Sequence, residues 1–130
     1  MTRKFKVYVY YNPNPKNKNT TDCVIRMLTK IYNISWQEAF LELTGIVLNE
    51  FEMPSSNFIW EKYLLNNGFV KRLLSPTCPD CITISEFSEM YDLGTYIVCT
   101  GSHVVAVFDG DYYDAWDSGN EIVTYYFERR

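Results

Sequence analysis

Residues 101–119 read GSHVVAVFDGDYYDAWDSG and contain two β-rich runs on either side of a turn. The runs HVVAVFD and YYDAWDS are dominated by β-branched and aromatic residues, which favour strands. An Asp-Gly pair between two such runs is a strong hairpin signal. The stretch therefore predicts an antiparallel hairpin, and the number of residues in its loop sets which side chains of the two strands face each other.

Two more β-rich runs flank this hairpin, TYIVCT at 95–100 and EIVTYYFER at 121–129. Gly-containing turns separate the four runs, so the C-terminal part of the chain is predicted to form an antiparallel meander. Near the start of the chain, FKVYVYY at 5–11 alternates and is rich in β-formers, which predicts a further strand. The sheet is therefore expected to come mainly from the residues after Gly94.

Helical patterns occupy the first half of the chain, at about 23–32, 35–51 and 56–66. Ser35 and Glu38 have capping-box spacing at the start of the second helix, and Thr83 and Glu86 repeat it before the short segment EFSEMY. Helices first and strands afterwards predict the α+β class. The chain of 130 residues is expected to be one domain, residues 1–130, with N-terminal helices packed on a C-terminal antiparallel β-sheet.

The charge balance argues against several kinds of partner. Twelve Lys and Arg against sixteen Asp and Glu give a net charge of −4, so no basic surface for nucleic acid is expected. No apolar run approaches the roughly 18 residues of a membrane span, and the N-terminus lacks the apolar core of a signal peptide. We therefore expect a cytoplasmic protein with no nucleic-acid or membrane partner, and the sequence does not indicate its oligomeric state.

The four cysteines are expected to be reduced in the cytoplasm, which makes them free, metal-binding or catalytic. Cys78 and Cys81 form a CxxC motif. Structural zinc requires four ligands, and a redox role favours a thioredoxin-like setting that this segment lacks. We therefore predict a surface loop with two thiols that form a disulfide only on oxidation, and we predict no metal site and no cofactor.

Cys23 has a different setting, because it ends the polar stretch NKNTTDC and opens the apolar helical run VIRMLTKIY. The first N–H groups of a helix have no intrahelical partners, and the helix dipole is positive there, so both stabilise a thiolate. The only histidine, His103, begins the strand HVVAVFD. A cysteine at a helix start and a histidine on a later strand are the two parts of a thiol nucleophile and its general base.

A third group should orient the imidazole of His103, and the hairpin loop decides which carboxylate can do so. With a three-residue loop over 109–111, His103 stands opposite Asp117. With a two-residue loop, it stands opposite Trp116, and Asp114 becomes its diagonal neighbour. We favour Asp117, because WDSG ends the strand where a carboxylate can be partly buried beside the ring, and we keep Asp114 as the alternative.

Acyl transfer to a thiolate also requires hydrogen-bond donors for the developing oxyanion. The backbone amide of Cys23 is one candidate. Asn17, six residues upstream, is another, because its side-chain NH2 group can swing to the same point. This role would explain the loop at 12–22, whose eleven residues include no core-forming side chain.

Asn17 six residues before Cys23, the Asp-Cys pair that opens a helix, and the GSHVVAV strand followed by WDSG resemble the papain-like cysteine peptidase superfamily. The chain is most similar to the compact bacteriocin-processing (double-glycine) peptidase-like group of bacteria and phages. That group usually has Gln where this chain has Asn17, and it has an Asp one hairpin after the His. The resemblance implies a papain-like fold, with Cys23 as nucleophile, His103 as base, Asp117 as orienting acid and Asn17 as oxyanion donor.

Two functions are compatible with these residues. The first is a cysteine peptidase or amidase that cleaves a peptide or isopeptide bond of a peptide or protein substrate, through a Cys-His-Asp triad and a thioester intermediate. The second is a catalytically inactive papain-like binding module, with a phage as one source of the gene, whose pocket survives without turnover. The sequence favours the enzyme, because a site that has lost its catalytic activity need not keep Cys, His, Asp and an amide donor together.

Overall fold

The computed structural model describes residues 7–53 and 56–129. The helices are α1 (Cys23–Tyr32), α2 (Trp36–Glu50), α3 (Asn57–Asn66) and α4 (Ile84–Met90). The strands are β1 (Tyr8–Tyr10), β2 (Phe69–Leu73), β3 (Thr95–Cys99), β4 (Val104–Phe108), β5 (Asp111–Asp114) and β6 (Tyr125–Arg129). The α+β class is thus confirmed, while the first residues of the predicted strand at 5–11 lie outside the described part of the chain.

The sheet has the strand order β1-β5-β4-β3-β6-β2, which differs from the predicted antiparallel meander in two ways. First, β1 pairs in parallel with β5, so the sheet is mixed. Second, β6 pairs with β3 instead of β5, because β1 already occupies the free edge of β5. The sequence analysis also missed β2, an edge strand held by its ladder to β6 and by an ion pair between Arg72 and Glu128 at 2.6 Å.

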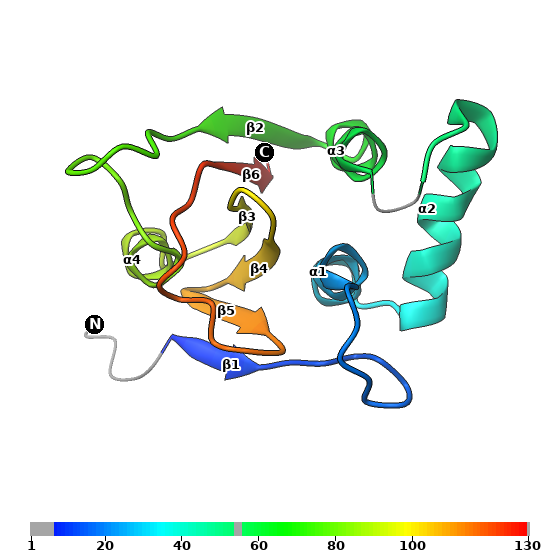
Figure 1. Cartoon of the computed structure of the whole chain (residues 1–130), viewed down its shortest axis with the longest axis horizontal. Helices are drawn as coiled ribbons and strands as arrows, with labels where there is room; N and C mark the ends of the chain where they lie inside the picture. Colours follow the sequence, from blue (N-terminus) through cyan, green and yellow to red (C-terminus); the bar gives the residue numbers. More distant parts are fainter. Residues whose placement is uncertain (1–6, 54–55, 130) are drawn as a thin grey trace.

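Alternating side chains of the sheet build two cores, one on each face. Ile97, Cys99 and Phe127 pack with α1, α2 and α3, whereas Val98 and Val105 pack with Phe87 of α4 and with other buried residues on that side. Successive residues of a strand point to opposite faces, so adjacent positions such as Ile97 and Val98 belong to different cores. Figure 1 shows α1 and α4 on opposite sides of the sheet, with α2 beyond α1.

The predicted helix starts agree with the caps of the structure. The Ser35 hydroxyl accepts a hydrogen bond from the Glu38 amide at 3.0 Å, and the Glu38 carboxylate accepts one from the Ser35 amide at 2.8 Å. Thr83 and Glu86 repeat both bonds at the start of α4. Both capping boxes are therefore confirmed, and each satisfies two amides that the helix itself leaves unpaired.

The turn between β4 and β5 has two residues, Asp109 and Gly110, since Phe108 pairs with Asp111. Both turn residues have a positive φ, 48° and 84°, as a type I′ hairpin turn requires. Such a turn matches the right-handed twist of the two strands, whereas the three-residue loop does not form. The register that we favoured from the sequence, with His103 opposite Asp117, is therefore wrong.

Cys78 and Cys81 are joined by a disulfide in the loop between β2 and α4, so the expectation of two free thiols is not met in this structure. Cys23 and Cys99 are free. Across residues 7–53 and 56–129, none of the helices combines the length and the apolar character needed to cross a membrane. A cytoplasmic location stays a prediction.

The hairpin turn gives a test of the register through one substitution made at two positions. Gly110→Ala should lower the free energy of unfolding by about 1 kcal/mol, because an alanine pays a steric penalty at positive φ. Gly45→Ala is the matched control: it lies inside α2, and apart from the adjacent backbone of its own helix the added Cβ meets no atom within 4 Å, so it should raise stability by about 0.5 kcal/mol or more. Urea denaturation measures both, and the same sign for both would contradict the turn.

Candidate active site

Cys23 is the first residue of α1, and its side chain is half-buried at the wall of a cavity of about 200 Å³. The preceding residue, Asp22, is the N-cap, but its side chain caps no amide of the helix. The lining comes from α1, from the start of α3, from the segment between β3 and β4 and from the start of β6, and includes Asn57, Trp60, Ser102, His103 and Tyr125. The thiol predicted to be a nucleophile therefore lies beside a space that a small part of another molecule can enter.

His103 lies immediately before β4 and shares this cavity with Cys23. Its Nε2 atom is 2.6 Å from Oδ2 of Asp114, which leaves Nδ1 as the nitrogen available to the sulfur. The ring also packs against Trp116, with 5.0 Å between the ring centroids. These contacts fix the plane of the imidazole and shield it from solvent.

Electrostatic effects favour an ionised sulfur. Burial alone would raise the pKa of the Cys23 thiol, but hydrogen bonds from His103 and from the backbone amide of Val104, together with the charges of His103 and Arg26, lower the pKa below its usual value. Burial also disfavours the charged form of His103, yet hydrogen bonds to Asp114 and Cys23 and the charges of both raise its pKa to about 9. Both shifts favour the thiolate and imidazolium forms of the pair over the neutral thiol and imidazole.

Asp114 takes the position that we assigned to Asp117. It is fully buried, and besides His103 it accepts a hydrogen bond from the Ser118 hydroxyl at 2.6 Å. Burial would raise the pKa of Asp114, but hydrogen bonds from His103 and Ser118 and the charges of His103 and Arg26 lower it. Asp117 instead accepts hydrogen bonds from the Tyr112 hydroxyl and the Gly119 amide, so the choice of Asp117 as the acid beside His103 is wrong.

Asn17 does not line the cavity at Cys23. Its Oδ1 atom accepts hydrogen bonds from the Tyr10 hydroxyl at 3.4 Å and from the side-chain NH2 group of Asn12 at 3.3 Å. These bonds tie it into the polar loop that precedes α1. The structure therefore brings Cys23, His103 and Asp114 together but does not place the Asn17 side chain beside them.

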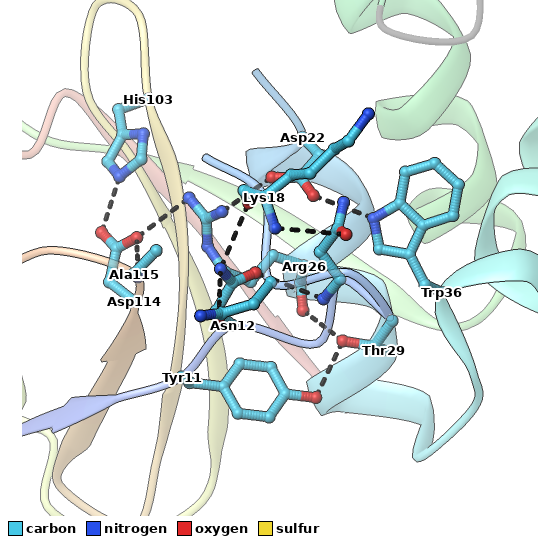
Figure 2. Close-up of polar contacts among 12 residues, drawn as sticks. Tyr11, Asn12, Lys18, Asp22, Arg26, Thr29, Trp36, His103, Asp114 and Ala115 are labelled. Atoms are coloured by element: carbon cyan, nitrogen blue, oxygen red, sulfur yellow. Dashed lines mark hydrogen bonds and ion pairs between the residues drawn. The ribbon is translucent and has the colours of Figure 1, made fainter. Parts of the chain in front are cut away.

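Two residues at the site carried no signal in the sequence analysis. Arg26 is buried, and its guanidinium lies 3.0 Å from Oδ1 of Asp114, as Figure 2 shows. Its position inside the apolar run VIRML, one turn after Cys23, was the available hint. Asn57 lines the cavity at the start of α3, and its Oδ1 accepts from Trp60 Nε1 at 3.0 Å, which leaves its NH2 group as a further donor.

The described residues include no group of three or more His, Cys, Asp or Glu side chains that could hold a metal ion. No protein-family model, curated protein or solved structure matches this chain. The chemical case for the site therefore rests on its own residues. A lowered thiol pKa, a hydrogen-bonded imidazole and a buried carboxylate are the parts of an activated thiol nucleophile.

The ionised sulfur predicts selective alkylation at mildly acidic pH. At pH 6, Cys23 should react with iodoacetamide measurably faster than an ordinary thiol, because a lowered pKa leaves a larger fraction of it as thiolate. Cys99 should not react in the folded protein, because it is buried and its pKa is raised. His103→Ala should abolish the difference. Intact-mass spectrometry measures the labelling, and equal rates at Cys23 in wild type and His103→Ala would contradict the pairing.

The two carboxylates give a second prediction. Asp114→Asn should slow the alkylation of Cys23 at pH 6 by about tenfold or more, because a neutral amide no longer stabilises the imidazolium of His103. Asp117→Asn, the matched control, should change that rate less than twofold, since Asp117 contacts Tyr112 and Gly119 instead. Circular dichroism verifies that both variants are folded. The reverse ranking would restore Asp117 as the partner of His103.

Proposed function

We propose that this chain is a cysteine peptidase or amidase of papain-like type, which cleaves a peptide or isopeptide bond by attack of the Cys23 sulfur. The observation that carries the proposal is the continuous contact from the Cys23 thiol through His103 to the buried Asp114. Structural cysteines are usually inert because their pKa is raised, as it is at Cys99. Cys23 differs from Cys99 because its pKa is lowered and because it lines a cavity.

In the proposed reaction, the Cys23 thiolate attacks the scissile carbonyl carbon and forms a tetrahedral intermediate. The His103 imidazolium then gives its proton to the leaving amine as the C–N bond breaks, which leaves a thioester on Cys23. Neutral His103 takes a proton from a water molecule, and the resulting hydroxide attacks the thioester. The acid product leaves, and the thiolate and the imidazolium are restored. Asp114 stays ionised throughout and holds the ring in one orientation.

The developing oxyanion requires donors near the sulfur. The backbone amide of Cys23 belongs to the first turn of α1, where N–H groups have no intrahelical acceptor, and it is the donor favoured by the helix geometry. The NH2 group of Asn57, at the wall of the same cavity, is a second candidate. Asn57 replaces Asn17 in this role, because the Asn17 side chain is bound within its own loop.

One observation favours the second candidate function, a papain-like binding module without turnover. The side chain that the resemblance assigns to the oxyanion, Asn17, does not line the cavity at Cys23. A site that lost its oxyanion donor would still keep a reactive thiol and a cavity. Alkylation of Cys23 therefore does not separate the two functions, and only turnover does.

The deciding experiment is incubation with a mixture of peptides, followed by mass spectrometry, with hydroxylamine added to trap a thioester as a hydroxamate. Wild type should release cleaved peptides, and Cys23→Ala should lower the rate by about 10⁴-fold or more. The rate should fall as pH rises through about 9, because His103 then loses the proton that it must give to the leaving amine. Reproducible peptide binding with no cleavage and no hydroxamate would favour the binding module.

A further inference from the structure

The carboxylate of Asp114 has donors on all sides. Oδ2 accepts from His103 Nε2 and from the Ser118 hydroxyl, both at 2.6 Å. Oδ1 accepts from the Ala115 amide at 2.8 Å and from Arg26 at 3.0 Å. A carboxylate offers about four lone-pair sites, so this one is fully occupied. Its rotation is blocked, and one oxygen is held toward the imidazole.

Among these donors, only Arg26 comes from the helix that carries Cys23, and it lies three residues after the thiol. Its Nη1 donates to Oδ1 of Asp22 at 2.9 Å, while Nη2 lies 3.0 Å from Oδ1 of Asp114. Oδ2 of Asp22 in turn accepts from Trp36 Nε1 at 2.8 Å. Figure 2 shows this chain of contacts running from His103 through Asp114, Arg26 and Asp22 to Trp36.

The chain is deeply buried, since Arg26 is 6% exposed, Asp22 5% and Asp114 0%. Buried charges require partners of opposite sign, and a planar guanidinium can serve two carboxylates at once. A lysine ammonium has one charged centre on a flexible stem and cannot reproduce the fork. The geometry therefore makes Arg26 a fixed bridge between the start of α1 and the acid on β5.

We propose that Arg26 is a positioning residue of the site: by bridging Asp22 and Asp114, it sets the orientation of the carboxylate that holds His103 and so aligns the imidazole with Cys23. The catalytic meaning of this alignment rests on the proposed function, whereas the alignment itself does not. Arg26 touches neither the cavity wall at Cys23 nor the imidazole directly, so it positions the ring through Asp114, while its charge also acts on the Cys23 sulfur.

His103 is the only histidine, so nuclear magnetic resonance of protein labelled with ¹⁵N-histidine reports this ring alone. In wild type, the Nε2 proton should give a slowly exchanging signal shifted downfield by the bond to Asp114. Arg26→Gln should shorten the lifetime of that proton at least tenfold, because Asp114 is released on one side. It should also slow Cys23 alkylation at pH 6, because the imidazolium is held less well against the sulfur and because the positive charge of Arg26 is lost.

Two further variants separate positioning from charge and from stability. Arg26→Lys keeps the charge and should recover much of the alkylation rate, while the Nε2 proton still exchanges faster than in wild type. Phe87→Leu removes packing on the opposite face of the sheet, so it should lower stability and leave both site measurements unchanged. A stability loss alone therefore does not mimic the expected pattern.

The proposal is overturned if folded Arg26→Gln keeps the wild-type Nε2 proton lifetime, whatever its alkylation rate, since Arg26 then does not position the ring. If Arg26→Gln does not fold, Arg26→Lys decides: a wild-type proton lifetime in that variant overturns the proposal, and a shortened one supports it. These measurements need no substrate. Absence of peptide turnover, by contrast, overturns the proposed function. The bridging role of Arg26 is then still tested by the lifetime of the His103 Nε2 proton.

Discussion

The buried Asp114 carboxylate is the contact on which the polar centre of this molecule depends. It joins four parts of the chain, since its donors come from α1, from the residue before β4, from its own neighbour Ala115 and from Ser118 in the loop after β5. A charge removed from water is tolerated only when its hydrogen-bonding sites are filled. The contacts of Asp114 with Arg26 and His103 help to meet this condition. The same contacts hold the imidazole ring that faces Cys23.

The hairpin turn decides which carboxylate takes this place. Asp109 and Gly110 adopt positive φ and close the turn with two residues, so Val107 pairs with Tyr112 and Asp114 falls diagonal to His103. One more residue in the loop would move every partner on β5 and bring Asp117 opposite the ring instead. Because the side-chain period of a strand is two, such a slip would also exchange the faces of the strand. The chemistry of the site is thus fixed at a turn several residues away from it.

The two thiols that remain free show how position controls reactivity within one fold. Cys99 is buried in the core between the sheet and α1–α3, and its pKa is raised. Cys23 stands at the edge of the same core, where the start of α1, the His103 ring and the Val104 amide all stabilise negative charge. Both residues pack with the same apolar cluster, so hydrophobic packing does not distinguish them. Contact with His103 and the Val104 amide does distinguish them.

The sequence by itself determined the elements whose signals are local: α1 from its apolar spacing, the starts of α2 and α4 from their capping boxes, the strand-rich C-terminal part, and the pairing of Cys23 with the only histidine. Tertiary structure decided what depends on distant partners. The position of β6 beside β3 followed from β1 taking the edge of β5, and the placement of Asn17 followed from bonds within its loop. Asp114 and Arg26 form an ion pair because the fold buries both between α1 and the sheet. The sequence shows that each residue is charged, but it does not show which residue of opposite charge will be its partner.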